Sequence, residues 1–253
     1  LKRFCMKIQF AHSYEYIISL ENLLEAWREF AHGKRSRRDV QEFEFNLMSN
    51  IILLHKDLID RTYQHLTYDA FNISDPKPRI IHKASVRDRL LHHALYRVLY
   101  PFFGRTFIAD SYSCRVGKGI HKAINRFRAF AYRVSQNNIK TAWVLRCDIK
   151  KFFASIDQKK LMGIIKDSMP DEDTVWFISQ IIRSFHSAKI RKGLPLGNLT
   201  SQLLVNVFMN EFDQFMKHTL KTEYYIRYAD DFVILSHDRR LLEGMILRIR
   251  DFL

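Results

Sequence analysis

Apolar residues recur at intervals of three and four over several long stretches of the chain. In residues 19–31 (SLENLLEAWREFA) this spacing places an apolar stripe on one side of a helix, and Ser19 stands where an N-cap residue is expected. Similar patterns predict further helices over residues 40–57, 86–103, 116–136, 157–167, 172–186, 199–219 and 239–253. Much of the chain is therefore expected to be helical.

Shorter segments have the character of strands. Residues 141–149 (TAWVLRCDI) are β-branched and apolar and end at a carboxylate, which is typical of a buried central strand. Residues 223–228 and 232–236 flank the pair Asp230-Asp231 and indicate a β-hairpin. The order helices, strand, helices, hairpin, helix predicts an α+β fold.

Composition narrows the class of protein. Of the 253 residues, 47% are hydrophobic, which is enough to bury the core of one large domain or of two closely packed ones. Lys+Arg number 41 against 27 Asp+Glu, and the formal net charge of +14 indicates a polyanionic partner, usually nucleic acid; a basic solvated surface is the alternative. No apolar run approaches membrane-spanning length, and the three distant cysteines form no disulfide or zinc pattern. We therefore expect a cytoplasmic protein with no membrane partner.

Three carboxylates stand where metal binding is favoured. Asp148 ends the apolar segment, and a buried charge there is unfavourable unless a cation compensates it; an aspartate that caps the next turn is the alternative. Asp230 and Asp231 are adjacent acids in a predicted tight turn, where one acid would suffice. A bound cation explains the pair, and an ordinary Asp-rich turn is the alternative.

The three acids also have a joint explanation. Asp148 and Asp230 are 82 residues apart (230 − 148), so only the fold can bring them together, and a central strand beside a hairpin does so. Three carboxylates on adjacent strands can hold two Mg²⁺ ions roughly 3.5–4 Å apart. Mn²⁺ prefers the same oxygen ligands and can substitute.

Five motifs, in order along the chain, resemble those of reverse transcriptases. Asp148 with Phe152-Phe153 resembles the first palm motif, and Tyr228-Ala-Asp-Asp231 resembles the YxDD box. The segments that resemble the palm motif between them and the two fingers motifs are residues 193–202, 111–119 and 77–89. The resemblance runs from residue 20 to residue 250.

This resemblance implies a right-hand polymerase fold. It consists of fingers and a palm with an antiparallel sheet and packed helices, and the thumb is expected to lie largely outside this chain. The implied domains are an N-terminal helical extension over residues 1–60, fingers over 61–140 and a palm over 141–253, with fingers and palm closely packed.

Within the family, the string Leu196-Gly-Asn-Leu-Thr-Ser-Gln202 discriminates between groups. Retroviral and group II intron enzymes usually carry Gln where Leu196 stands, and group II enzymes usually end the string in Ser-Pro. An aliphatic residue before the glycine and a terminal Ser-Gln resemble the bacterial reverse transcriptases of diversity-generating retroelements. That resemblance implies error-prone copying of template adenine.

The resemblance also implies roles for single residues. Asp148 and Asp230 would bind both metal ions, with the Ile149 carbonyl and Asp231 as further ligands. Phe153 would exclude a ribose 2′-hydroxyl, and packing in the core is its alternative. Two further groups would bind dNTP (Lys77, Arg79, Arg87, Leu196 and Gly197) and the template (Arg115, Lys118, Ser201 and Gln202); a solvated basic face is the alternative for the cations.

The implied partners are a template RNA, a cDNA or primer strand, dNTPs and a small basic accessory protein. Three other functions stay open: a bacterial defence protein that performs untemplated or abortive synthesis, a non-catalytic RNA-binding module with a polymerase fold, and an RNA-dependent RNA polymerase. The three intact aspartates count against the module. The bulk of Phe153 counts against the RNA polymerase, because it would exclude ribonucleotides.

Overall fold

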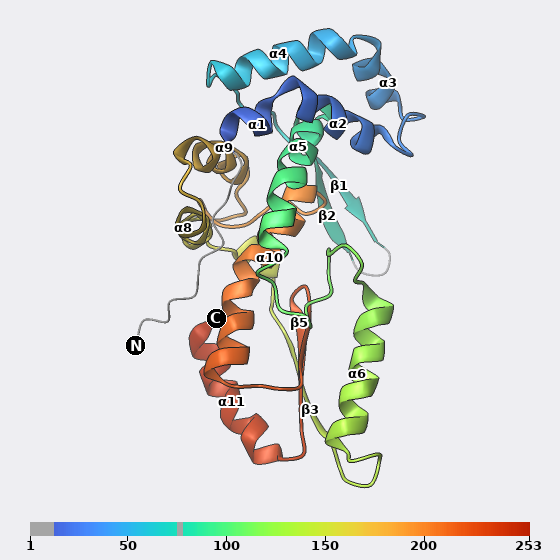
Figure 1. Ribbon diagram of the computed structural model, residues 1–253, viewed down its shortest axis with the longest axis vertical. Helices are drawn as coiled ribbons and strands as arrows, with labels where there is room; N and C mark the ends of the chain where they lie inside the picture. Colours follow the sequence, from blue (N-terminus) through green and yellow to red (C-terminus); the bar gives the residue numbers. More distant parts are fainter. Residues whose placement is uncertain (1–12, 75–77) are drawn as a thin grey trace. The chain divides into compact units, whose positions relative to one another are not determined.

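The computed structural model describes residues 13–74 and 78–253, which form two compact units (Figure 1). The first unit combines the segment that ends at Phe103 with Phe153–Leu204, and the second unit combines Gly104–Phe152 with Val205–Leu253. Each unit is thus built from two separate segments of the chain. In the described ranges, no helix is long and apolar enough to cross a membrane.

The N-terminal part of the first unit is helical. Its helices are α1 (Tyr14–Ile18), α2 (Leu20–Ala31), α3 (Arg38–Phe45), α4 (Leu47–Ile59) and α5 (Val86–Phe103). Helix α2 begins where its sequence predicts, because the Ser19 hydroxyl accepts a hydrogen bond from the Asn22 amide at 3.2 Å. It packs against α5. The buried stripe of α2 includes Leu23, Ala26, Trp27 and Phe30.

The prediction of one continuous helix over residues 40–57 is wrong. The helix is broken at Asn46, whose φ of −115° and ψ of 35° lie outside the helical region. Helix α3 packs against α5, whereas α4 packs against α1 and α2. The break lets the two halves reach different partners, and helical periodicity alone does not reveal it.

A hairpin and a second helical segment complete the first unit. Strands β1 (Asp69–Ile73) and β2 (Arg79–Lys83) pair antiparallel. The second segment contains α8 (Gln158–Ser168), α9 (Glu172–Arg183) and the start of α10 (Leu199–Gln214), and the short α7 (Phe152–Ser155) stands at its beginning. The turn before α10 attaches to β2, because the His82 amide donates to the Leu196 carbonyl at 3.0 Å and the Asn198 side chain donates to the His82 carbonyl at 2.9 Å.

The second unit is a three-stranded antiparallel sheet with helices packed on it (Figure 1). Strands β3 (Trp143–Asp148), β4 (Tyr225–Tyr228) and β5 (Asp231–Ser236) lie in the order β3-β5-β4. Helix α6 (Ile120–Val134) packs against β4 and β5, and α11 (Arg239–Phe252) packs against β5 and β3. The end of α10 continues as the π-helical segment η1 (Phe215–Thr219). One core cluster consists of Tyr112, Ala123, Phe130, Val134, Ile226 and Leu235.

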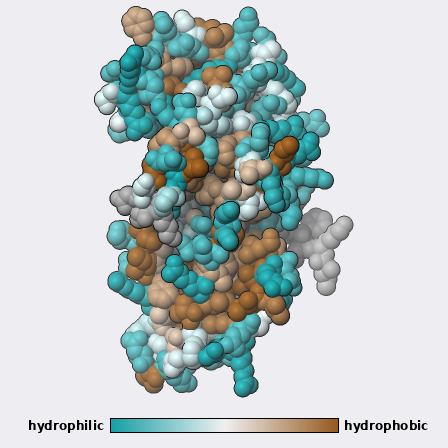
Figure 2. All heavy atoms as spheres, turned by 180° about the vertical axis from the view of Figure 1, so that it is seen from behind, coloured by the Kyte–Doolittle hydropathy of each residue, from teal (hydrophilic) through white to brown (hydrophobic). Residues whose placement is uncertain are grey.

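The prediction that residues 141–149 form a buried central strand is wrong. β3 is an edge strand of the described sheet, and its residues Trp143 and Val144 are 40% and 45% exposed. The central strand is β5, where Phe232, Ile234 and Leu235 are buried. Seen from behind, apolar residues gather on parts of the protein surface (Figure 2). The apolar run at residues 141–149 therefore predicted a strand correctly, but it did not predict that the strand would be exposed at the edge of the sheet.

The fold class agrees with the sequence. The mixture of helices with antiparallel sheets confirms the predicted α+β fold. The predicted domains are consecutive ranges, whereas each compact unit is made from two separated segments. The boundaries at residues 60 and 140 stay a prediction.

Candidate metal centre

Three carboxylates meet at one end of the sheet in the second unit. Asp148 is the last residue of β3 and Asp231 the first of β5, and the antiparallel register pairs them directly. Asp230 lies in the turn between β4 and β5. One carboxylate oxygen of each residue lies within 4.8 Å of the other two. The fold thus brings together the three acids that the sequence singles out.

The turn that carries Asp230 is as short as a hairpin allows. Tyr228 pairs with Asp231, so Ala229 and Asp230 alone connect the strands. Ala229 has a φ of 56°, in the left-handed region that short hairpin turns need. A residue other than glycine adopts it at a cost of about 1–3 kcal/mol. Nη1 of Arg227 donates a hydrogen bond to the Ala229 carbonyl at 3.1 Å and so helps to hold this conformation.

The charges at this end of the sheet favour a bound cation. Like charges directly opposite each other on paired strands are destabilising. Arg146 lies 3.5 Å from Asp231, but the two side chains are 77% and 48% exposed, so their attraction is worth at most about 1 kcal/mol. A divalent cation compensates clustered carboxylates more strongly.

The spacing of the oxygens also suits a divalent metal. Two oxygens bound to one Mg²⁺ at about 2.1 Å are at most about 4.2 Å apart. The three carboxylates lie within 4.8 Å of one another, so small side-chain rotations bring them onto a shared ion. Ile149 directly follows β3, which places its carbonyl one residue from Asp148. Its role as a ligand stays a prediction.

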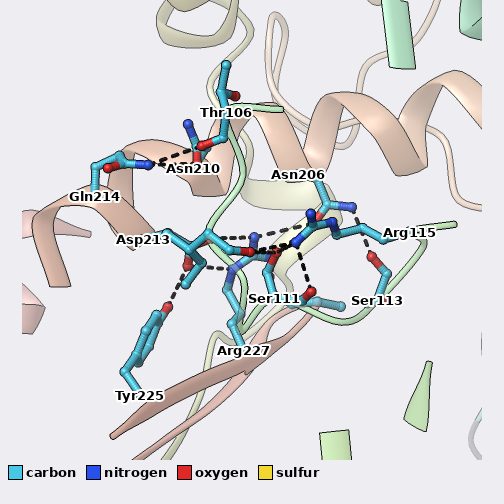
Figure 3. Close-up of polar contacts among 12 residues, drawn as sticks. Thr106, Ser111, Ser113, Arg115, Asn206, Asn210, Asp213, Gln214, Tyr225 and Arg227 are labelled. Atoms are coloured by element: carbon cyan, nitrogen blue, oxygen red, sulfur yellow. Dashed lines mark hydrogen bonds and ion pairs between the residues drawn. The ribbon is translucent and has the colours of Figure 1, made fainter. Parts of the chain in front are cut away.

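A buried ion pair beside the turn was missed by the sequence analysis (Figure 3). The guanidinium of Arg227 donates from Nε and Nη2 to the two carboxylate oxygens of Asp213 at 2.8 and 2.7 Å, and both side chains are almost fully buried. The Tyr225 hydroxyl donates to Asp213 Oδ1 at 2.7 Å. Burial, reinforced by the Asp213 charge, raises the pKa of Tyr225 well above 10, so this hydroxyl keeps its proton. The available signal was an arginine inside the otherwise aromatic and apolar strand Tyr225–Tyr228.

The described residues expected near the nucleotide lie in the first unit, and one further candidate lies outside the described residues. That residue is Lys77. Arg79 begins β2 and is exposed. Phe153 is half-buried, and its carbonyl accepts a hydrogen bond from the Leu194 amide at 2.9 Å. The contacts of these residues with a dNTP stay predictions.

Gly197 has a structural reason of its own. Its φ is 103°, and a Cβ atom added there would lie 2.8 Å from Cγ2 of Ile81 on β2. The neighbouring Leu196 is half-buried and bonds to β2 through its carbonyl. The glycine thus permits the close approach of this loop to β2.

Several predicted nucleic-acid contacts already have protein partners. Arg87 pairs with Asp57 at 2.6 Å and lies over the Tyr63 ring. Arg115 donates to the Ile108 carbonyl and to the Ser111 hydroxyl, each at 2.6 Å. These bonds stabilise the first and the second unit, respectively, whatever else the two arginines bind.

The remaining template candidates differ in their exposure. Lys118 donates to the Ala109 carbonyl at 2.7 Å, and partial burial together with the Arg115 charge lowers its pKa. Ser201 is buried in the first turns of α10, and Gln202 is half-buried there. Their contacts with a template stay predictions.

Comparison with protein families decides the class of this chain. Residues 73–253, which include the three carboxylates, match the model described as reverse transcriptase (RNA-dependent DNA polymerase). The chain belongs to the reverse transcriptase family. Divalent metal ions are generally used by reverse transcriptases, which agrees with the fit of the acidic cluster to a metal.

Individual relatives of this reverse transcriptase domain include intron-encoded proteins. It is 26% identical over 183 residues to an uncharacterized 91 kDa protein in the cob intron of Schizosaccharomyces pombe, covering 66% of this chain and 22% of that protein. It is 25% identical over 171 residues to Protein YkfC of Escherichia coli, covering 65% and 44%. It is 27% identical over 139 residues to the group II intron-encoded protein LtrA of Lactococcus lactis, covering 51% and 21%. The chain thus spans less than half the length of each of these relatives.

A solved structure shares the fold. A chain of a partial Cas6-RT-Cas1–Cas2 complex superposes with a TM-score of 0.56 at 21% identity, covering 94% of this chain and 42% of that one. At this identity the likeness shows the fold alone.

Proposed function

We propose that this chain is the fingers and palm of an RNA-directed DNA polymerase that makes cDNA from an RNA template by two-metal nucleotidyl transfer. The observation that carries the proposal is the meeting of Asp148, Asp230 and Asp231 at one end of the sheet, within 4.8 Å. The family match supports the reaction class. The net charge of +14 suits an RNA partner, because phosphate contacts by Lys and Arg dominate such binding.

The protein contributes mainly placement to this reaction. The β3–β5 register fixes Asp148 opposite Asp231, and the two-residue turn places Asp230 beside them. Oxygen ligands of this kind favour Mg²⁺, with Mn²⁺ as a substitute. When bound, two such ions activate the primer 3′-hydroxyl and neutralise the leaving pyrophosphate. Little covalent chemistry is then required of the side chains.

The proposed substrate contacts are assigned to single residues. Phe153 excludes a ribose 2′-hydroxyl, and Leu196 and Gly197 adjoin the nascent base pair. Of the described cations proposed for the triphosphate, Arg79 is better exposed than Arg87, which is bonded to Asp57. The other proposed contacts are Lys77 for the triphosphate and Arg115, Lys118, Ser201 and Gln202 for the template.

The proposal extends to error-prone synthesis at template adenine in a diversity-generating retroelement, with a small basic accessory protein as partner. Leu196 supports this subtype, because its side chain offers no hydrogen bond to an incoming nucleotide. A bacterial defence-associated reverse transcriptase is the second candidate. A chain of a Cas6-RT-Cas1–Cas2 complex has the same fold; that likeness concerns the fold alone, so primer extension decides between the two candidates.

Primer extension tests the proposed function. For this test the fingers and palm are joined to a thumb, and the protein is incubated with poly(rA)/oligo(dT), dTTP and Mg²⁺, and in parallel with oligo(dT) alone. Extension that requires poly(rA) supports the RNA-directed DNA polymerase. Extension without template favours the untemplated synthesis of a defence protein, and salt-sensitive RNA binding without any extension favours a non-catalytic module.

A further inference from the structure

The strand that precedes the metal-binding turn contains a buried arginine whose hydrogen-bonding capacity is fully used. A guanidinium has five N–H groups. Arg227 Nε donates to Asp213, and Nη2 donates to Asp213 and to Asn206 Oδ1. Nη1 donates to Asn206 Oδ1 at 3.3 Å and to the Ala229 carbonyl at 3.1 Å. Every N–H group thus has an acceptor.

A pair buried this deeply needs an explanation other than stability. Arg227 is 1% exposed and Asp213 is 0% exposed. Removing two charges from water offsets most of their attraction, and buried pairs can often be replaced by apolar residues without loss of stability. Stability alone therefore does not explain the pair. Its hydrogen-bond geometry instead fixes the position of a neighbouring backbone group.

That position is the peptide immediately before Asp230. The Ala229 carbonyl, which accepts from Arg227, belongs to the peptide that links Ala229 to Asp230. Ala229 is in the left-handed conformation, so without this bond the peptide is free to rotate toward a more common one. The bond therefore fixes the direction in which Asp230 leaves the turn.

The same network is fixed at its other side to the loop that precedes α6. The Asn206 side chain donates to the Ser113 carbonyl at 3.0 Å. The backbone of Arg227 bonds to the same loop, because its amide donates to the Asp110 carbonyl and its carbonyl accepts from the Tyr112 amide, each at 3.0 Å. Figure 3 shows the Arg227 guanidinium beside Asp213 and Asn206 of α10, with Asn206 in turn in contact with Ser113 of the loop.

We infer that Arg227 and Asp213 are positioning residues, which hold the Ala229–Asp230 peptide in the orientation that lets Asp230 share a divalent metal with Asp148 and Asp231. This inference rests on the proposed function of the three aspartates. A lysine cannot replace Arg227 in this role, because its single ammonium group cannot reach Asp213, Asn206 and Ala229 in one planar arrangement.

The test is Mn²⁺ binding by the full chain, measured by electron paramagnetic resonance without nucleic acid or dNTP. The main variant is the double substitution Arg227→Met with Asp213→Leu, which removes both buried charges together and so leaves none unpaired. Thermal unfolding checks that it folds. The matched control is Arg97→Met, which removes a partly buried, ion-paired arginine of α5 in the first unit.

We expect the double variant to fold and to bind Mn²⁺ at least ten-fold more weakly than the wild type, while Arg97→Met binds as the wild type does. A folded double variant whose Mn²⁺ affinity stays within two-fold of the wild type overturns the inference. If the double variant does not fold, Arg227→Lys keeps the charge, loses the Ala229 bond and is judged by the same criterion. Failure of the wild type itself to bind Mn²⁺ contradicts the proposed function of the three aspartates, and this inference falls with it.

Discussion

The loop that contains Leu196 depends on a glycine at position 197, and replacing this glycine by alanine tests that dependence. At φ 103° an alanine is strained by about 1–3 kcal/mol. Its Cβ would also lie 2.8 Å from Cγ2 of Ile81, and moving that side chain off its rotamer costs about 0.5–1.5 kcal/mol more. We therefore expect Gly197→Ala to lower the free energy of unfolding by about 2–4 kcal/mol.

Thermal unfolding followed by circular dichroism measures this change. For a protein of this size, 2–4 kcal/mol corresponds to a fall in melting temperature of roughly 5–15 °C. Gly33→Ala is the matched control, because Gly33 has a φ of 67° and no atom lies within 4 Å of an added Cβ. It should be destabilised only by the strain of the left-handed region, about 1–2 kcal/mol.

A double-mutant cycle isolates the contact with β2. Ile81→Ala removes the Cγ2 atom, so Gly197→Ala should be about 0.5–1.5 kcal/mol less destabilising in that background. Gly197→Ala should also raise the KM for dTTP in primer extension. The Leu196 carbonyl accepts from the His82 amide of β2, so displacing the loop from β2 shifts Leu196, which is proposed to adjoin the incoming nucleotide. If Gly197→Ala destabilises the protein no more than Gly33→Ala does, or if its effect is unchanged in the Ile81→Ala background, the loop does not depend on a glycine at position 197.

Three further predictions concern pH, sugar selection and fidelity. Burial lowers the pKa of His92 well below 6.5 and that of His93 to about 4, so below pH 6.5 the unfolded chain binds more protons than the folded chain. The free energy of unfolding, measured with urea, should therefore fall from pH 6.5 to pH 4, by at most about 1.4 kcal/mol per pH unit for each histidine. A free energy of unfolding that does not fall across this range contradicts the prediction. Phe153→Ala should admit ribonucleotides, and the loss of discrimination between dNTP and rNTP should exceed the roughly 1–3 kcal/mol of an ordinary pocket methylene. Unchanged rejection of rNTPs would mean that Phe153 only packs in the core. Leu196→Gln should reduce misincorporation opposite template adenine by roughly 5–150-fold in sequenced cDNA, and equal, low error rates in both proteins would leave an ordinary reverse transcriptase.

The acidic cluster could be predicted from sequence because its signals are local. Asp230 and Asp231 stand together in a hairpin turn and Asp148 ends an apolar strand, and these local signals, together with the resemblance to reverse transcriptase motifs, predicted a shared metal site. Helix α5 was likewise predicted with its bounds, because its apolar periodicity is uninterrupted from residue 86 to residue 103. In each case the decisive interactions lie within one segment or between neighbouring strands.

What the sequence did not reveal depends on distant partners. β3 was predicted to be central because its residues are apolar, yet strand order is decided by pairing with β5, whose Asp231 lies opposite Asp148 but 83 residues later in the sequence (231 − 148). Arg227 could be recognised as an unusual strand residue, but its partner Asp213 lies on α10 and is one of 27 acidic residues. Which acid an arginine meets is decided by the packing of the helix against the sheet, and periodicity does not encode it.

Primer extension by aspartate-to-asparagine variants tests whether Asp148, Asp230 and Asp231 form the metal centre of a polymerase. Asp148→Asn and Asp230→Asn are compared with the wild type on poly(rA)/oligo(dT) with dTTP and Mg²⁺. Asp251→Asn, at an exposed position of α11, is the matched control. Neutralising one of three mutually repelling acids should leave the fold intact or slightly more stable. We expect Asp148→Asn and Asp230→Asn to melt no lower than the wild type and to extend no primer, while Asp251→Asn extends it normally; extension by pure, folded Asp230→Asn at more than a few per cent of the wild-type rate would contradict the account.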